Sequence, residues 1–388
     1  MMLHKQHISP TMTNLLEKLG YWLVDQNLIF VNKTQALMHC TSHNTTDIKY
    51  CIGSTAFGLS NWTIEPIESL LDLYKKRARQ LREKYDYVIL TYSGGSDSTC
   101  VLHSFIDNDI FPDEVVSWTL EGDGFDLQNF NHNKELYHSR DLVQKNIIDK
   151  GITFNTLDYS NLFDTLFDQD WCFKSDHMLR AGTWARYKSV YIDRYRKLKD
   201  AGKSCCVVYG MEKPNLHIDA AGNIFSVFQD SNLASGVDPS QYSPEYNGPD
   251  RENFFVTPDL PELTIKQSHI VANEFKMLQQ MKSLNFNLSE GESFDFKKYK
   301  DHVTDILYGH CYDRSRAFSI GKAHGIFAPR DEWVWNLPES DLRKQKIFSG
   351  LSTVKSGVDS KWFNHSTFTQ GYVGCITDRY YLGKNLWK

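Results

Sequence analysis

The sequence lacks any long apolar run and any strong excess of one charge. No uncharged apolar stretch reaches the roughly 20 residues that a membrane-spanning helix needs, and the chain opens without the apolar core of a secretion signal. Its 43 basic and 48 acidic residues give a formal net charge of -5, so no overall field favours nucleic acid or an anionic membrane. We therefore expect a cytoplasmic protein with no membrane partner.

Paired cysteine motifs are also missing. The eight cysteines include no C-x-x-C pair, the spacing found in many zinc and redox sites, and a chain of 388 residues does not need disulfides to fold. They stand at positions 40, 51, 100, 172, 205, 206, 311 and 375. We expect reduced thiols, with Cys205 and Cys206 packed inside a buried strand.

Low-complexity tracts and fixed-period repeats are absent too, which excludes a solenoid. Hydrophobic residues make up 41% and charged residues 23% of the chain, as in ordinary globular proteins. The length exceeds that of a usual single core and indicates one large domain with additions, or two domains.

A regular alternation of helical and strand patterns begins near residue 65. Helical spacing over 65–84 is followed by the apolar, β-branched run 87–92, which is typical of a strand buried on both faces. Further strands are predicted over 114–120, 153–157 and 204–209, with helical patterns over 100–106, 133–150 and 162–199 between them. The fold class predicted is α/β, with a doubly wound, mostly parallel sheet.

Around this domain the composition changes. We expect a small N-terminal β element in 1–64, with two strands around the polar turn 25–27, and the α/β domain in 65–218. A segment rich in Gly, Pro, Asn, Asp and Ser follows at 219–262, which we interpret as a long loop or a lid that orders on ligand binding. Residues 263–388 are expected to be mainly helical, with helices over 263–284 and 297–308.

The loop after the first predicted strand of that domain is typical of phosphate binding. It joins a buried strand to a helix N-terminus, where unpaired N–H groups and the helix dipole favour anions. Its residues are Ser93, Gly94, Gly95, Ser96, Asp97, Ser98 and Thr99. The glycines let the backbone approach a ligand closely, the hydroxyls add donors, and Asp97 suits such a site if Mg²⁺ is bound there, directly or through water.

Residues 91–99, Thr-Tyr-Ser-Gly-Gly-Ser-Asp-Ser-Thr, resemble the S-G-G-x-D-S loop of the N-type ATP pyrophosphatases. This superfamily is also called the PP-loop or adenine nucleotide alpha hydrolase-like group, and it includes asparagine synthetase and the phosphoadenylylsulfate reductases. The similarity extends over about 86–214. It implies ATP and Mg²⁺ as cofactors, cleavage of ATP to AMP and pyrophosphate, and an adenylated substrate oxygen that a nitrogen or other nucleophile then attacks.

Other strand ends should border the same pocket, because doubly wound sheets bind ligands at the carboxyl ends of their strands. After the second strand, Leu120, Glu121 and Asp123 are placed to border adenine and ribose; a plain acidic turn is the alternative for the two carboxylates. After the last predicted strand, Gly210 and Lys213 resemble the late loop of the family. Lys213 is expected to contact phosphates, with a solvated loop lysine as the alternative.

A cluster before that last strand is the next candidate. His177, Arg180, Trp184, Arg186 and Tyr187 fall where family members bind substrate or phosphates. We select Arg180 and Arg186 as candidate catalytic cations. The alternative is that they only solvate a helix face.

The C-terminal region offers weaker candidates. His310, Cys311, Arg314 and Arg316 are candidates for contact with the substrate. A core cysteine and a surface basic cluster explain the same residues, and we favour that interpretation.

The partners expected are ATP and a small-molecule or nucleobase substrate, with ammonia or another nucleophile supplied from solution or by a separate donor. The chain opens with Met-Met-Leu and not with the cysteine that an asparagine synthetase glutaminase needs. The alternatives left open are a sulfonucleotide reductase, an enzyme that modifies nucleic acid bases, and a non-catalytic nucleotide-binding protein.

Overall fold

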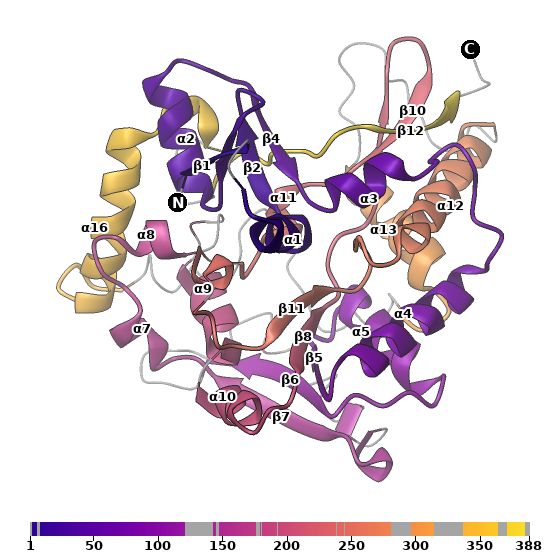
Figure 1. Cartoon of the computed structure of the whole chain (residues 1–388), viewed down its shortest axis with the longest axis horizontal. Coiled ribbons are helices and arrows are strands. Elements are labelled where there is room, and N and C mark those ends of the chain that lie inside the picture. Colours follow the sequence, from indigo (N-terminus) through magenta and orange to yellow (C-terminus); the bar gives the residue numbers. More distant parts are fainter. Residues whose placement is uncertain are drawn as a thin grey trace.

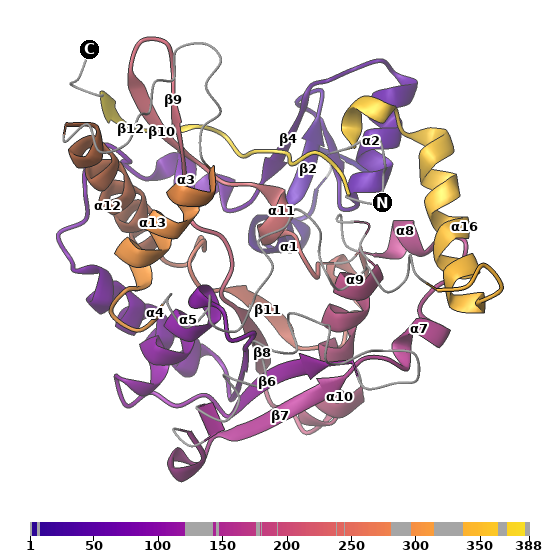
Figure 2. The same cartoon turned by 180° about the vertical axis from the view of Figure 1, so that it is seen from behind.

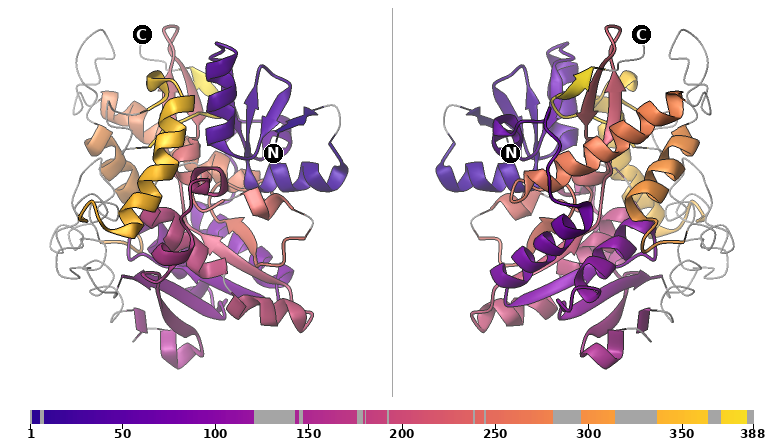
Figure 3. Two further views of the ribbon diagram at one scale, coloured as in Figure 1. Left: turned by 90° about the vertical axis from the view of Figure 1, so that its left-hand side faces the viewer. Right: turned by 90° about the vertical axis from the view of Figure 1, so that its right-hand side faces the viewer.

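The structure is a computed structural model. It describes residues 2–5, 8–120, 143–144, 147–175, 179, 181–191, 193–237, 239–243, 245–280, 296–313, 337–363 and 371–384. An antiparallel N-terminal sheet and a larger parallel sheet lie at opposite ends of the molecule, with helices between and around them (Figures 1 and 3). Within the described ranges, no helix has both the length and the apolarity needed to cross a membrane.

The N-terminal sheet has the strand order β1-β3-β2-β4 and is antiparallel throughout. Its strands are β1 Met2–His4, β2 Tyr21–Val24, β3 Leu28–Phe30 and β4 Ile48–Cys51, and helices α1 Pro10–Leu19, α2 Lys33–Ser42 and α3 Ser54–Leu59 accompany them. Asp25 and Gln26 have positive φ angles in the turn between β2 and β3. The two strands predicted around that turn are confirmed.

The second sheet is parallel in all five strands, so the predicted α/β class is confirmed. Its order is β11-β8-β5-β6-β7. The strands are β5 Tyr87–Thr91, β6 Glu114–Thr119, β7 Thr153–Asp158, β8 Cys205–Tyr209 and β11 Asp250–Asn253. All except β11 match strands that the sequence predicts.

Helices cover both faces of the parallel sheet. Successive side chains of a strand point to opposite faces, so each strand contributes to two cores. Val88 and Leu90 of β5 pack into a core with α4 Leu70–Lys84, α5 Ser96–Ile106, α12 Pro261–Gln280 and α13 Phe296–Tyr308. Ile89 points to the opposite core, formed with α8 Trp171–Lys174, α9 Ala181–Lys188, α10 Asp193–Asp200 and α16 Leu342–Gly357. Figure 2 shows α4, α5, α12 and α13 together on one side and α16 with α7 Leu162–Thr165 and α8 on the other.

The segment 219–262, predicted as a long loop or a lid, contains regular elements. It contains β10 Asn223–Val227, which pairs with β9 Asn215–Ile218, then α11 Asp230–Leu233, a 3-10 turn and β11. The parallel sheet therefore includes a strand beyond the predicted boundary at 218. The pattern missed β11 because its sequence, Asp-Arg-Glu-Asn, is polar although three of its four residues are buried.

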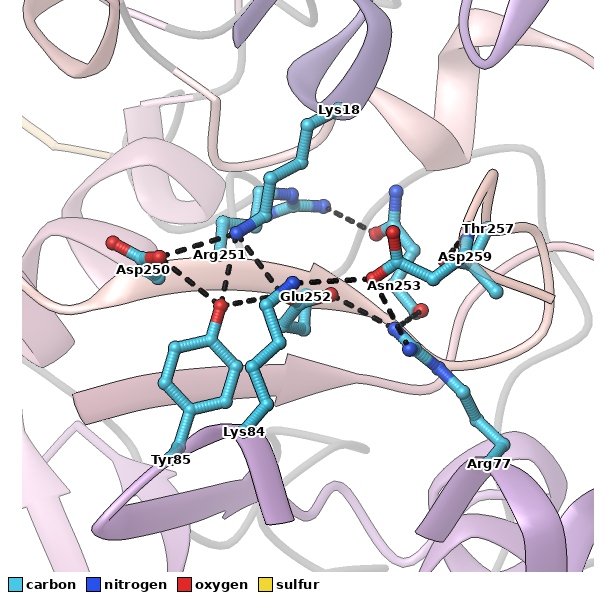
Figure 4. Close-up of polar contacts among 10 residues, drawn as sticks. All are labelled: Lys18, Arg77, Lys84, Tyr85, Asp250, Arg251, Glu252, Asn253, Thr257 and Asp259. Atoms are coloured by element: carbon cyan, nitrogen blue, oxygen red, sulfur yellow. Dashed lines mark hydrogen bonds and ion pairs between the residues drawn. The ribbon is translucent and has the colours of Figure 1, made fainter. Parts of the chain in front are cut away.

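Side chains from other elements form ion pairs and hydrogen bonds with the buried Glu252 carboxylate of β11 (Figure 4). The Glu252 carboxylate, 3% exposed, lies 2.8 Å from Arg77 Nη2, 2.9 Å from Lys18 Nζ and 3.1 Å from Lys84 Nζ. Tyr85 donates its hydroxyl to the same carboxylate at 2.5 Å. Because Lys18 belongs to α1, and Arg77 and Lys84 to α4, the cluster ties the N-terminal region to the edge of the parallel sheet.

The C-terminal region is mainly helical in its described part, as predicted. α12 and α13 match the two predicted helices, and α16 is a third. The exception is β12 Tyr380–Lys384, which pairs with β10 to complete a three-stranded sheet of order β12-β10-β9.

Candidate functional site

The loop between β5 and α5 folds back on itself through its own serines. The Ser98 hydroxyl accepts a hydrogen bond from the Ser93 amide at 3.2 Å and donates one to the Gly95 carbonyl at 3.1 Å. Gly94 has a φ angle of 71°, a conformation that glycine adopts at little cost. Gly95 then caps α5 without a side-chain hydrogen bond.

The first turn of α5 presents unpaired donors. Its first helical hydrogen bond runs from the Thr99 amide to the Gly95 carbonyl at 3.0 Å. Within the described residues, the amides of Ser96, Asp97 and Ser98 donate no hydrogen bond to the protein. Free amides at the positive end of a helix dipole form a ready anion site.

Strand order places this loop at a topological switch point. The chain leaves β5 through α5 to reach β6 on one side, whereas it leaves β8 on a path that reaches β11 on the other side. β5 and β8 are neighbours and parallel, so their carboxyl ends lie together. A crevice between two such strand ends is where open α/β sheets bind their ligands.

The loop after β8 packs directly on the first turn of α5. A β-carbon on Gly210 would lie 2.7 Å from Val101 Cγ2 and 2.9 Å from the Asp97 carbonyl oxygen, closer than real contacts allow. Two residues later, buried Glu212 has a φ angle of 70°, uncommon for a residue with a side chain. Its carboxylate accepts hydrogen bonds from Asn215 at 2.8 Å and Asn232 at 2.6 Å, which fix the loop before Lys213.

Lys213 and Asp97, predicted from separate loops, meet in the structure. Lys213 Nζ lies 2.6 Å from Asp97 Oδ1, with the two side chains 19% and 30% exposed. The same ammonium lies 5.0 Å from the ring centroid of Tyr308, at the end of α13. Burial, together with the Asp97 charge, raises the pKa of Tyr308, so its hydroxyl stays neutral beside the pair. Sequence analysis did not identify Tyr308 as a site residue.

Arg186 lies close to this crevice and is buried, which excludes the solvated-helix alternative for it. Its guanidinium carbon lies 4.3 Å from the ring centroid of Trp118 in β6 and 5.0 Å from that of Tyr187. Tyr187 in turn donates to Met211 Sδ at 3.7 Å, two residues before Lys213. Arg186 Nε has no hydrogen-bond partner within the described residues.

Apart from His310 and Cys311, the remaining predicted residues are either buried or outside the described residues. Leu120 is fully buried directly after β6. Trp184 belongs to an aromatic core with Trp171 and Phe167 at centroid distances of 5.9 and 5.3 Å, so it packs and does not line the crevice. The others lie outside the described residues: Glu121, Asp123, His177, Arg180, Arg314 and Arg316.

His310 and Cys311 are brought to Cys100, on the second turn of α5. The sulfur atoms of Cys100 and Cys311 and a ring nitrogen of His310 all lie within 4.8 Å of one another. A hydrogen bond from Cys100, with a further contribution from His310, lowers the pKa of the Cys311 thiol to about 5 despite partial burial. Sequence analysis named His310 and Cys311 as candidates for substrate contact but favoured a core cysteine and a surface basic cluster. It did not join them to Cys100, because Cys100 and Cys311 are far apart in the chain and neither belongs to a C-x-x-C pair.

A separate surface hollow of about 580 Å³ is lined by Lys188, Arg196 and residues of the segment 240–248. No residue of either loop lines it. We therefore assign the candidate site to the strand ends and not to this hollow.

No protein-family model matches the chain, and no curated protein sequence matches it significantly. The similarity to the ATP pyrophosphatases therefore depends on the loop 93–99 itself.

Proposed function

We propose that the chain is an enzyme that binds ATP with Mg²⁺ and cleaves it to AMP and pyrophosphate. One observation carries this proposal: the free amides at the start of α5 and the Lys213 ammonium converge where β5 and β8 end side by side. Donors and a cation gathered at a switch point suit a polyphosphate.

The residues present fit both cofactors. The amides of Ser96, Asp97 and Ser98, with the nearby hydroxyls of Ser93 and Thr99, would hold the pyrophosphate portion. Gly94 adopts a positive φ angle in the loop, and Gly210 lets the loop after β8 pack against the Asp97 backbone. The close packing also fixes how far Lys213 stands from the helix N-terminus.

Asp97 would hold Mg²⁺, directly or through water, because a carboxylate beside phosphates repels them unless a cation stands between. In the structure that cation is Lys213, at 2.6 Å. With Mg²⁺ held by Asp97, the Lys213 ammonium would be free to contact the phosphates. The ion pair thus accounts for an acidic residue in an anion site.

The chemistry would be adenylation. A substrate oxygen attacks the α-phosphorus, the bond to the β-phosphate oxygen breaks, and pyrophosphate leaves while held by the loop. A nitrogen or other nucleophile then displaces AMP from the activated substrate. The protein would contribute positioning and charge neutralisation, and no covalent protein nucleophile is needed. Arg186, buried with an unpartnered Nε close to the crevice, is the candidate for contact with the nucleotide or the substrate.

Product analysis tests the proposal. The purified chain is incubated with ATP, Mg²⁺ and fractionated cell metabolites, beside an Asp97→Ala variant, and nucleotides are separated by ion-exchange chromatography. We expect AMP and pyrophosphate in equal amounts from the unmodified chain only, and the stimulating fraction identifies the substrate. Tight ATP binding without turnover in every fraction would instead favour a non-catalytic nucleotide-binding protein.

A further inference from the structure

Three side chains that bind transition metals meet where α5 packs on α13. Cys100 comes from the second turn of α5, and His310 and Cys311 come directly after α13. Their ligand atoms, two sulfurs and one ring nitrogen, all lie within 4.8 Å of one another. None of the three takes part in the phosphate contacts proposed above.

The spacing suits a tetrahedral ion. Zinc binds thiolate sulfur at about 2.3 Å and imidazole nitrogen at about 2.0 Å, so its ligand atoms lie roughly 3.5 to 3.8 Å apart. The three ligand atoms lie at most 4.8 Å apart in the structure, so small side-chain rotations would bring them to the distances of a zinc site. Two thiolates and an imidazole favour zinc over the hard cations Mg²⁺ and Ca²⁺.

An ion can reach the three side chains from solvent, and a fourth ligand can complete its coordination. Cys100 is buried, Cys311 is partly exposed and His310 is exposed, so an ion can enter from the His310 side. His103 follows Cys100 by three residues on the same face of α5. Its Nδ1 lies 3.0 Å from an Asp107 carboxylate oxygen, which leaves Nε2 as the ring nitrogen for a ligand, in the manner of a carboxylate that orients a metal-binding histidine. Water or His103 would fill the fourth position.

We propose that Cys100, His310 and Cys311 bind one Zn²⁺ ion that fastens the end of α13 to α5. The ion would act on the neighbouring site through Tyr308, two residues before His310, whose ring lies 5.0 Å from the Lys213 ammonium. Zinc would thus hold Tyr308 against the pair formed by Lys213 and Asp97. Metal binding itself does not depend on the ATP chemistry.

Metal content and cobalt spectroscopy on the full chain, without ATP, test this proposal. We expect one zinc per chain after purification with reductant, and the absorption bands of tetrahedral cobalt thiolate when Co²⁺ is added to the metal-free protein. Cys311→Ser should abolish the thiolate bands of that residue and weaken Co²⁺ binding at least about tenfold. Cys51→Ser, which alters a cysteine of the N-terminal sheet, should leave content and spectrum unchanged.

His310→Gln guards against a folding artefact, because the imidazole is exposed. It should weaken Co²⁺ binding to a similar extent and remove the drop in thermal unfolding midpoint that a chelator causes in the unmodified chain. Purified protein without zinc and without cobalt bands would overturn the proposal. So would equal metal affinity in Cys311→Ser, or a Cys100 to Cys311 disulfide located by peptide mapping of the non-reduced protein.

Discussion

Replacing Gly210 by alanine tests whether the two loops of the candidate site are held at a fixed distance. The added β-carbon would lie 2.7 Å from Val101 Cγ2 and 2.9 Å from the Asp97 carbonyl oxygen. The second contact is with backbone, so it cannot be relieved by a side-chain rotation. The loop after β8 and the first turn of α5 must therefore move apart by several tenths of an ångström.

Two consequences follow from that movement. Overpacking of this kind costs about 1 to 3 kcal/mol of stability. Misplacement of Lys213 relative to the helix N-terminus should also weaken the site, since a displacement of about 1 Å can cost on the order of a hundredfold in rate. We expect AMP formation to fall about tenfold to a hundredfold in Gly210→Ala, under conditions where the variant is still folded.

A matched variant separates this effect from a general response to alanine. Gly58 lies in α3, and a β-carbon there would meet no atom within 4 Å. Gly58→Ala should leave AMP formation unchanged and be neutral or slightly stabilising. Urea unfolding gives the stability and chromatography of nucleotides gives the rate. If Gly210→Ala matched the unmodified chain in both, the close packing of the two loops would be refuted.

Three further predictions concern charged side chains. Lys213→Ala should weaken binding of ATP with Mg²⁺ by about 2 kcal/mol, roughly 30-fold in calorimetry, while Lys203→Ala, before the opposite end of β8, should not. Arg186→Ala should cost about 2 kcal/mol in urea unfolding, because its buried guanidinium stacks on Trp118 and Tyr187; equal stability would contradict that packing. For Glu252, burial raises the pKa, but Lys18, Arg77 and Lys84 outweigh it and the pKa is lowered overall. The stability that Glu252 contributes is therefore present above the unfolded-state pKa of about 4.3 and lost as pH falls toward the folded value. Glu252→Gln should cost about 3 to 5 kcal/mol at pH 7 and flatten the loss of stability below about pH 4, whereas an unchanged acid profile would exclude this role.

The parallel sheet was predictable where its strands are apolar. The runs that form β5 and β8 are buried on both faces, and such runs identify themselves in a sequence. β11 was not predictable, because its buried charges are tolerated only through partners from other elements. Glu252 pairs with Lys18 and Arg77. Arg251 donates to the Leu233 carbonyl and lies over the ring of Tyr209. Local sequence patterns do not indicate partners that come from distant parts of the chain.

The candidate site divides in the same way. The loop 93–99 was found because a strand end and a helix start frame it. Lys213 was found because it follows a predicted strand. Tyr308 and Cys100 were missed, and His310 and Cys311 were named without their partner Cys100, because the packing of α13 on α5 brings these residues together. The positive φ angle of Glu212 is another product of the assembled fold, sustained by hydrogen bonds from Asn215 and Asn232.

Exchange of labelled pyrophosphate into ATP tests the proposed chemistry most directly. The unmodified chain and Asp97→Ala are each incubated with ATP, Mg²⁺, labelled pyrophosphate and the stimulating metabolite fraction, and the label in ATP is counted. Reversible adenylation predicts label in ATP with the unmodified chain and none above background with Asp97→Ala. Unlabelled ATP, with ADP and phosphate accumulating instead, would contradict cleavage between the α- and β-phosphates.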